Sequence, residues 1–248
     1  MFVYTCVPDA ILMRRDYHNW YSHRLGRHIE LLAYGHGGSP LLVFPTSQGR
    51  FFEYENSGMI HAFWQRIEAG QIQVFCVDSI DSESWYNRSI HPHDRVMRHI
   101  AYENYIIFEV LPLINNLTWA PQIGVTGCSL GAYHALNFAL RHPDAVSACI
   151  AMSGSFDMKS FMNGYYDTDF YFNNPVDYVP NQNDPWFLER YAQMKLILAA
   201  GDHDICLGEN FRMAHILGLK GIPHWLDVWT GGERHDWPLW QRMAVKFF

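Results

Sequence analysis

Apolar residues along the chain fall into two kinds of stretch: short continuous runs, and longer stretches with helical spacing. The continuous runs predict strands, and Gly37-Gly38-Ser39 between the first two is a turn signal. We therefore expect those two strands to form an antiparallel pair. In chain order the predicted strands are HIELLAYGH, PLLVFP, QIQVFCVDS, QIGVTG, SACIAMSGS, KLILAAGD and PHWLDVWTGG.

Between these runs, apolar residues recur every three or four positions, which is typical of amphipathic helices. Such stretches cover residues 58–70, about 94–114, 132–143, 211–222 and 237–248. Strands and helices therefore alternate, and the strands are apolar almost throughout. This pattern predicts an α/β fold in one domain over residues 1–248, a mostly parallel sheet with helices on both faces. In such sheets the chemistry lies at the carboxyl ends of the strands.

Composition narrows the class of protein. Of the 248 residues, 49% are hydrophobic, and the formal net charge is −7 with no long basic run, which argues against a nucleic-acid partner. No stretch reaches the ~18 apolar residues of a membrane span, and the N-terminal residues lack the features of a secretion signal. Widely spaced cysteines without a C-x-x-C pair indicate reduced thiols, so we expect a cytoplasmic protein. The oligomeric state stays open, a homo-oligomer included.

A serine between two glycines stands in GCSLG, residues 127–131, and fits the pattern G-x-S-x-G. The predicted strand QIGVTG runs directly into it and the helical stretch AYHALNFAL follows, which is the strand–turn–helix setting of a nucleophile elbow. A side chain at either glycine would collide with backbone in so sharp a turn, and the helix N-terminus would stabilise an oxyanion beside Ser129. The alternative is that Ser129 only caps the helix.

A histidine that could serve as the base follows the last predicted strand. His235, in TGGERHDWPLW, lies between that strand and the last helix, so it is placed to reach Ser129 across the strand ends. His134, on the helix after the serine motif, and His203 are the rival bases.

The acid of such a site is predicted in the loop of AAGDHD, which offers Asp202 and Asp204. Either residue gives the chain order Ser, Asp, His of the α/β-hydrolase triad. The other would then cap the helix that follows.

These motifs resemble the putative-esterase family of α/β-hydrolases, which includes S-formylglutathione hydrolases (esterase D), feruloyl esterases and mycolyltransferases. The resemblance covers residues 21–240 and is carried by FPTSQG, GCSLGAYHAL, AMSGSFD, AAGDHD and GGERHDWPLW. The family's closing pattern is close to G-G-x-H-x-W-x-x-W. This chain has one extra residue before His235, while Trp237 and Trp240 match.

The resemblance implies an α/β-hydrolase fold and ester hydrolysis through an acyl-enzyme, with no cofactor and no metal. The family's acid often stands at the fourth position of G-x-x-D, which favours Asp204. Ser129 would attack the ester carbonyl, with His235 as base and Asp204 orienting it. The oxyanion would be held by the backbone N–H of Leu130 and by one from the early loop, Ser47. That loop reads PTSQG where the family usually has a His-Gly-type turn.

The same acyl-enzyme would serve an acyltransferase or a thioesterase, because water and other acceptors attack one intermediate. A hydrolase-fold protein that binds a ligand or partner without turnover is the alternative from another class. A missing triad residue would favour that alternative, and none is missing. The predicted partner is therefore a small-molecule ester.

Aromatic residues after two of the predicted strands are candidates for substrate contacts. Trp85 and Tyr86 follow the strand QIQVFCVDS, and Trp237 stands two residues after the candidate base. Rings at the mouth of the site would suit an aromatic or otherwise planar substrate group.

The segment 156–191 is too long for a plain connection and carries many rings. It predicts a partial cap over Ser129, with Tyr165 and Tyr166 as substrate contacts. Packing of an irregular segment is an alternative of equal weight.

The tetrapeptide HPHD, which begins at His91, invites comparison with a metal site. Its position before a long helical stretch favours residues that start a helix instead, with Asp94 as the cap.

Overall fold

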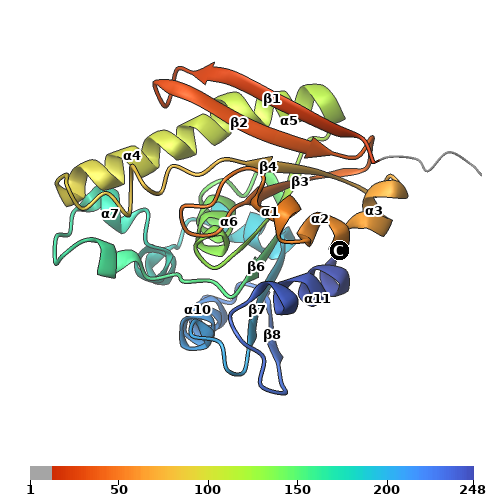
Figure 1. Cartoon of the computed structure of the whole chain (residues 1–248). Coiled ribbons are helices and arrows are strands. Elements are labelled where there is room, and N and C mark those ends of the chain that lie inside the picture. Colours follow the sequence, from red (N-terminus) through yellow and green to blue (C-terminus); the bar gives the residue numbers. More distant parts are fainter. Residues whose placement is uncertain (1–12) are drawn as a thin grey trace, which may run out of the picture.

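The computed structural model describes residues 13–248, which contain an eight-stranded sheet in the order β1-β2-β4-β3-β5-β6-β7-β8 (Figure 1). Strands β3 to β8 run parallel to one another, whereas β2 pairs antiparallel with both β1 and β4 at one edge of the sheet. The strands are β1 (Arg15–Ser22), β2 (Arg27–Tyr34), β3 (Ser39–Phe44), β4 (Ile72–Val77), β5 (Ile123–Cys128), β6 (Val146–Met152), β7 (Lys195–Gly201) and β8 (Trp225–Trp229).

The predicted antiparallel pairing of the first two apolar runs is wrong. β2 pairs antiparallel with β4, with Leu32 opposite Cys76, and β4 separates β2 from β3. All residues of β4 are buried, so this strand gains most from a place inside the sheet with partners on both sides. β3 consequently lies parallel to β4 and β5.

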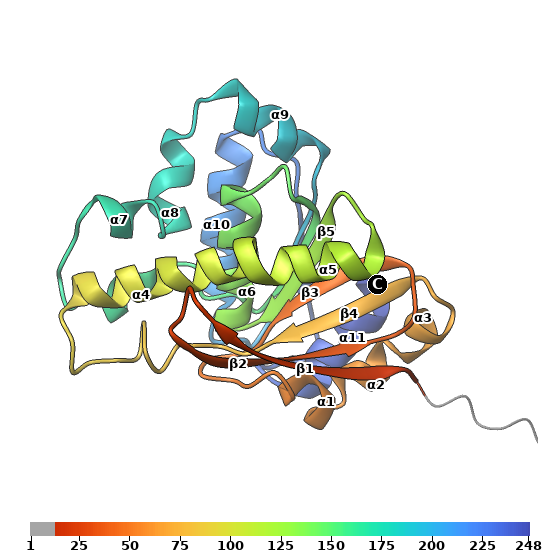
Figure 2. The same ribbon diagram turned by 90° about the horizontal axis from the view of Figure 1, so that it is seen from above.

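Helices cover both faces of the sheet, as predicted (Figures 1 and 2). Alternate side chains of β3 show the two layers, because Leu42 packs in a core with α4, α6 and α10, whereas Leu41 packs in a core with α2, α3 and α11. The helices are α1 (Glu53–Asn56), α2 (Met59–Ala62), α3 (Trp64–Glu68), α4 (Pro92–Tyr105), the π-helical η1 (Ile106–Val110), α5 (Leu111–Thr118), α6 (Leu130–Arg141), η2 (Met158–Phe161), α7 (Thr168–Tyr171), α8 (Pro175–Tyr178), η3 (Val179–Asn181), α9 (Pro185–Gln193), α10 (Leu207–Leu219) and α11 (Trp237–Phe247).

The segment 156–191 folds into the short helices η2 to α9, and α7 lies beside the first turns of α4 (Figure 2). Its start is fixed by Glu209 of α10, which accepts the backbone N–H groups of Phe156 and Asp157 at 2.5 and 3.0 Å. Many of its rings belong to the main core, so packing accounts for much of its aromatic content. The buried rings are Phe156, Phe170, Tyr178 and Tyr191, and the exposed ones include Tyr166, Phe172 and Trp186.

Two further expectations from the sequence concern membrane-spanning segments and the state of the cysteines. Within residues 13–248, no helix combines the length and apolar character needed to cross a bilayer. Cys76, Cys128, Cys149 and Cys206 are free and buried. Cys6 and the N-terminal stretch assessed for a secretion signal lie outside the described residues, at least as far as residue 12.

Candidate active site

Ser129 lies at the sharp turn between β5 and α6. Its φ of 57° and ψ of −122° are values that a residue with a side chain rarely adopts. The glycines on either side allow this turn. A Cβ on Gly127 would lie 2.3 Å from the backbone of Gly131, and a Cβ on Gly131 would lie 2.4 Å from the carbonyl oxygens of Phe44 and Pro45. The Ser129 side chain makes no capping hydrogen bond to α6, so capping is not its role.

His235 lies in the loop between β8 and α11, and its two ring nitrogens face two different partners. The Nε2 atom is 3.0 Å from Ser129 Oγ, and the Nδ1 atom is 2.8 Å from Asp204 Oδ1. The side chain is 18% exposed, so it can reach a substrate while remaining held in place. The rival bases are placed differently, because His134 is buried against Asp81 and His203 is exposed; among residues 13–248 only His235 bonds to Ser129 Oγ.

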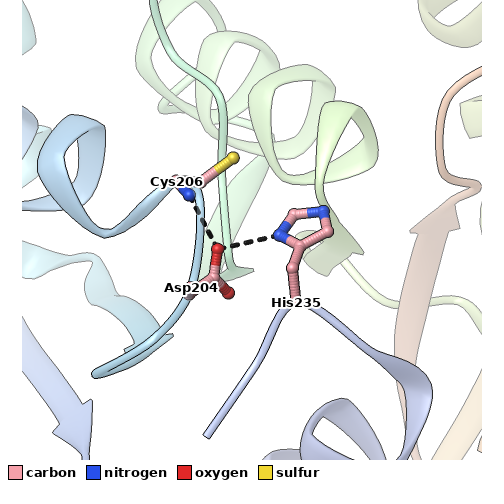
Figure 3. Close-up of side chains that lie close together, drawn as sticks. All are labelled: Asp204, Cys206 and His235. Atoms are coloured by element: carbon pink, nitrogen blue, oxygen red, sulfur yellow. Dashed lines mark hydrogen bonds and ion pairs between the residues drawn. The ribbon is translucent and has the colours of Figure 1, made fainter.

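Asp204 follows β7 and is almost fully buried. Figure 3 shows its carboxylate between the imidazole of His235 and the backbone N–H of Cys206, which donates to Oδ1 at 2.7 Å. Burial alone would raise the pKa of this carboxyl. Hydrogen bonds from His235, Ser153 and Cys206 outweigh burial and place the pKa of Asp204 below its usual value. The carboxylate therefore stays ionised beside the imidazole.

The other candidate acid, Asp202, has a different task. Its carboxylate accepts the backbone N–H groups of Gly231, Gly232 and Glu233 at 2.9, 3.0 and 2.7 Å. These three residues begin the loop that carries His235. Asp202 thus ties that loop to the end of β7 without contacting the imidazole.

Ser153, at the end of β6, is a functional candidate that the sequence analysis missed. Its hydroxyl donates to Asp204 Oδ2 at 2.5 Å and accepts the indole N–H of Trp240 at 2.8 Å. The residue is fully buried and has a positive φ of 53°, a conformation that needs support from its surroundings. The hydroxyl therefore fixes the carboxylate oxygen that His235 leaves free.

We expect Ser153→Ala to lower kcat by roughly ten- to a hundredfold, because a hydrogen bond to a charged group is worth ~1.5–3 kcal/mol and ~1.4 kcal/mol corresponds to a factor of ten in rate. Steady-state hydrolysis of an activated ester measures this. Ser155→Ala is the matched control, since the Ser155 hydroxyl bonds to Glu209 and should leave kcat unchanged. Equal kcat values for the two variants would remove Ser153 from the site.

The loop after β3 lies against the turn that carries Ser129, as the contact between Gly131 and Pro45 requires. The N–H of Thr46 donates to Glu53, that of Gln48 to Asp81, and that of Gly49 to the Thr46 carbonyl. Within residues 13–248, no acceptor takes a hydrogen bond from the Ser47 N–H. The same holds for the N–H of Leu130 in the first turn of α6.

The residues predicted to contact substrate differ in how far their side chains are exposed. Trp85 is fully buried and packs against His99, Tyr133 and Phe170, with ring centroids 4.8, 5.9 and 6.5 Å away. Its predicted place at the mouth of the site is therefore wrong, because its ring fills the core under α4 and α6. Tyr86, next to it, is partly exposed.

Trp237 is partly exposed at the start of α11, where its ring packs edge-on against Tyr54 and Trp240. Tyr165 and Tyr166 lie in the segment 156–191, and their hydroxyls donate to Asp167 at 2.8 Å and to Asp177 at 2.9 Å. Half of the Tyr166 surface is exposed.

Two groups of side chains in residues 13–248 have the donor types of a metal site. One is Asp204, Cys206 and His235, in which the carboxylate and the imidazole already bond to each other (Figure 3). The other is His93 with Asp167 and Asp169. In the tetrapeptide HPHD, His91 rather than Asp94 caps α4, because its ring accepts the N–H of His93.

Comparison with known proteins decides the family. The family model described as "Putative esterase" matches residues 22–242. The chain belongs to this family. It is accordingly an enzyme that hydrolyses carboxylic esters. A comparison with curated proteins gives no match.

Solved structures of esterases share the fold of this esterase. A ferulic acid esterase aligns with a TM-score of 0.75 at 16% identity, over 95% of this chain and 96% of that one. An S-formylglutathione hydrolase from Staphylococcus aureus aligns with a TM-score of 0.69 at 17% identity, over 95% and 97% of the two chains. Another, from Agrobacterium tumefaciens, gives 0.72 at 12% identity, over 95% of each chain. The predicted α/β-hydrolase fold is confirmed.

Proposed function

We propose that this esterase acts on small carboxylic esters through an acyl-enzyme formed on Ser129. The observation that supports this best is the continuous series of hydrogen bonds from Ser129 Oγ through His235 to Asp204. A serine on a strained turn, a histidine within hydrogen-bond reach and a buried carboxylate behind it are the parts that activate a weak nucleophile.

The reaction proceeds in two steps on these groups. Ser129 Oγ attacks the ester carbonyl while His235 Nε2 accepts its proton, and the same nitrogen then protonates the leaving alcohol. Water then enters and attacks the acyl carbonyl while His235 Nε2 accepts its proton, and His235 returns that proton to Ser129 Oγ as the carbon–oxygen bond to the serine breaks and the acid leaves. Asp204 holds the imidazole by Nδ1 and stabilises its charged form throughout.

The oxyanion of each tetrahedral intermediate is bound by the backbone N–H groups of Leu130 and Ser47. Both N–H groups are without a protein acceptor within residues 13–248 and belong to segments that touch at Gly131. The start of α6 adds the positive end of a helix dipole.

A fluorophosphonate probe followed by peptide mapping tests this proposal directly, because the probe bonds to an activated serine. We expect one labelled peptide, modified at Ser129. Labelling at another residue, or none in an active preparation, would overturn the assignment of the nucleophile.

The segment 156–191 is proposed as a partial cap that selects the acyl group. Replacing Tyr165 and Tyr166 by Ala should reduce kcat/KM for an aromatic acyl ester by roughly ten- to two-hundredfold, since one well-packed apolar contact is worth about 1–3 kcal/mol. Hydrolysis of an acetyl ester should change much less. Paired kinetics on the two esters measure this selectivity.

Phe172→Ala is the control for this double variant, because Phe172 is an exposed ring of the same segment that was not predicted to contact substrate. Equal losses on both esters, together with a lower melting temperature, would show that the two tyrosines only pack the segment.

A further inference from the structure

A second buried His–Asp pair lies behind the loop that carries Ser47. Asp81 follows β4 and His134 lies on α6, with 1% and 4% of their surfaces exposed. His134 Nε2 is 2.9 Å from Asp81 Oδ1. Among residues 13–248, no Lys or Arg pairs with Asp81. A carboxylate so deeply buried needs hydrogen-bond donors to offset the loss of its hydration, and His134 supplies only one.

The other Asp81 oxygen supplies the link to the loop. Oδ2 accepts the backbone N–H of Gln48 at 3.0 Å. Gln48 has a positive φ of 56° in a tight turn that Gly49 closes with its N–H to Thr46. A residue with a side chain keeps this conformation only where its surroundings hold it. At Gln48, the carboxylate of Asp81 supplies this support by accepting the backbone N–H.

A second carboxylate fixes the other end of the same turn. Glu53 accepts the N–H and the hydroxyl of Thr46 at 2.8 and 2.7 Å. The amides on both sides of Ser47 are therefore tied to carboxylates, and the amide of Ser47 itself is the one between them. Holding the two flanking amides sets the direction in which the Ser47 N–H points.

His134 connects this arrangement to the nucleophile. It lies on α6, the helix that begins directly after Ser129, and its ring stacks on Phe44 at the end of β3 with centroids 5.9 Å apart. The bonds from His134 to Asp81 and from Asp81 to Gln48 thus join the helix of the first oxyanion donor to the loop of the second.

We propose that Asp81, supported by His134, is a positioning residue that sets the distance and direction between the oxyanion donors Ser47 and Leu130. This role rests on the proposed acyl-enzyme mechanism. Preorganised donors act only when they point at the developing oxyanion. The Asp81–His134 pair therefore stabilises the transition state and does not change the affinity for the substrate.

Asp81→Ala removes the acceptor of the Gln48 N–H. We expect kcat to fall by roughly ten- to a hundredfold, since a donor misplaced by ~1 Å costs up to about a hundredfold. KM for 4-nitrophenyl acetate should stay close to the wild-type value. The Ki of a trifluoromethyl ketone, whose serine adduct carries an oxyanion, should rise by the same factor as kcat falls.

Two further variants separate positioning from stability. The double variant D81L/H134F replaces the buried pair by apolar side chains, a change that often keeps or raises stability. It should fold with a melting temperature near that of the wild type and still show the losses in kcat and in inhibitor binding. Asp81→Asn keeps an oxygen for the Gln48 N–H and should recover most of the wild-type kcat.

Glu109→Ala is the matched control, because Glu109 also accepts a loop N–H, that of Arg24, at 3.0 Å beside the edge strand β1. It should lower the melting temperature and leave kcat and the inhibitor Ki unchanged.

A folded D81L/H134F variant with wild-type kcat and Ki would overturn the positioning role. So would losses in Asp81→Asn as large as those in Asp81→Ala. Fluorophosphonate labelling of the wild-type protein keeps the two proposals apart. If Ser129 is labelled and the Asp81 variants remain fully active, only the positioning role fails. If Ser129 is not labelled, the acyl-enzyme mechanism itself fails.

Discussion

Ser129→Ala should abolish hydrolysis of an activated short-chain ester while the protein remains folded. Alanine leaves the ester carbonyl without a nucleophile, and the loss of a triad serine is worth roughly 10⁶-fold in kcat for a subtilisin-type enzyme. The turn depends on the absence of side chains at Gly127 and Gly131, which this substitution leaves unchanged, so the smaller side chain should not disturb it. Steady-state kinetics with 4-nitrophenyl acetate and a melting curve measure both effects.

The same substitution at Ser155 provides the comparison for Ser129. Ser155 lies in the next strand-end loop along the sheet, and its hydroxyl bonds to Glu209 rather than to a residue of the candidate triad. Activity of Ser129→Ala near that of Ser155→Ala would rule out Ser129 as the nucleophile.

The order of chemical groups in the chain was enough to predict the candidate triad. A serine motif after one strand, an acid after a later strand and a histidine after the last strand meet at one sheet edge, because parallel strands end on the same side. Chain order does not choose between Asp202 and Asp204, since both follow β7, and only the resemblance to the family's G-x-x-D pattern favours Asp204. Only the three-dimensional structure reveals that Asp204 bonds to His235 while Asp202 bonds to backbone N–H groups of the next loop.

Ser153 and Asp81 were within reach of the same reasoning and were still missed. Ser153 directly follows β6 and Asp81 lies shortly after β4, both at the carboxyl ends of strands. Ser153 stands in AMSGSFD, one of the stretches that carry the family resemblance, whereas Asp81 belongs to no motif. The role of each residue depends on which atoms its side chain contacts. Such contacts join residues 51 and 53 positions apart, which no local pattern in the sequence encodes.

The errors about the fold come from the antiparallel edge. β1 alternates between exposed and half-buried residues, so it lacks the continuous apolar run that marked the other strands. A turn signal between β2 and β3 suggested local pairing, but the pairing is non-local. The burial of β4 explains this pairing, because β4 is buried on both faces and lies between β2 and β3.

Asp204→Asn should lower kcat by roughly 10⁴-fold, the size of effect known for the equivalent change in a chymotrypsin-type triad. The amide keeps the shape of the carboxylate, but it cannot stabilise the imidazolium form of His235. Its NH₂ group also favours the tautomer in which Nε2 carries the proton, and that nitrogen can then no longer accept one from Ser129. Folding should survive, because the remaining amide oxygen can still accept the hydrogen bond from Ser153, although the Cys206 N–H loses its acceptor.

Asp202→Asn is the matched control, the same substitution two residues earlier in the same loop. Its side chain would keep one oxygen for the N–H groups of Gly231, Gly232 and Glu233, so the loop that carries His235 should loosen without losing the His235–Asp204 bond. We expect a loss in kcat of less than about tenfold, of the size of one weakened hydrogen bond. Parallel kinetics on both variants decide the acid, because the change at the true triad residue must be the costlier one. A larger loss at Asp202 would mean that the assignment of Asp204 as the acid is wrong.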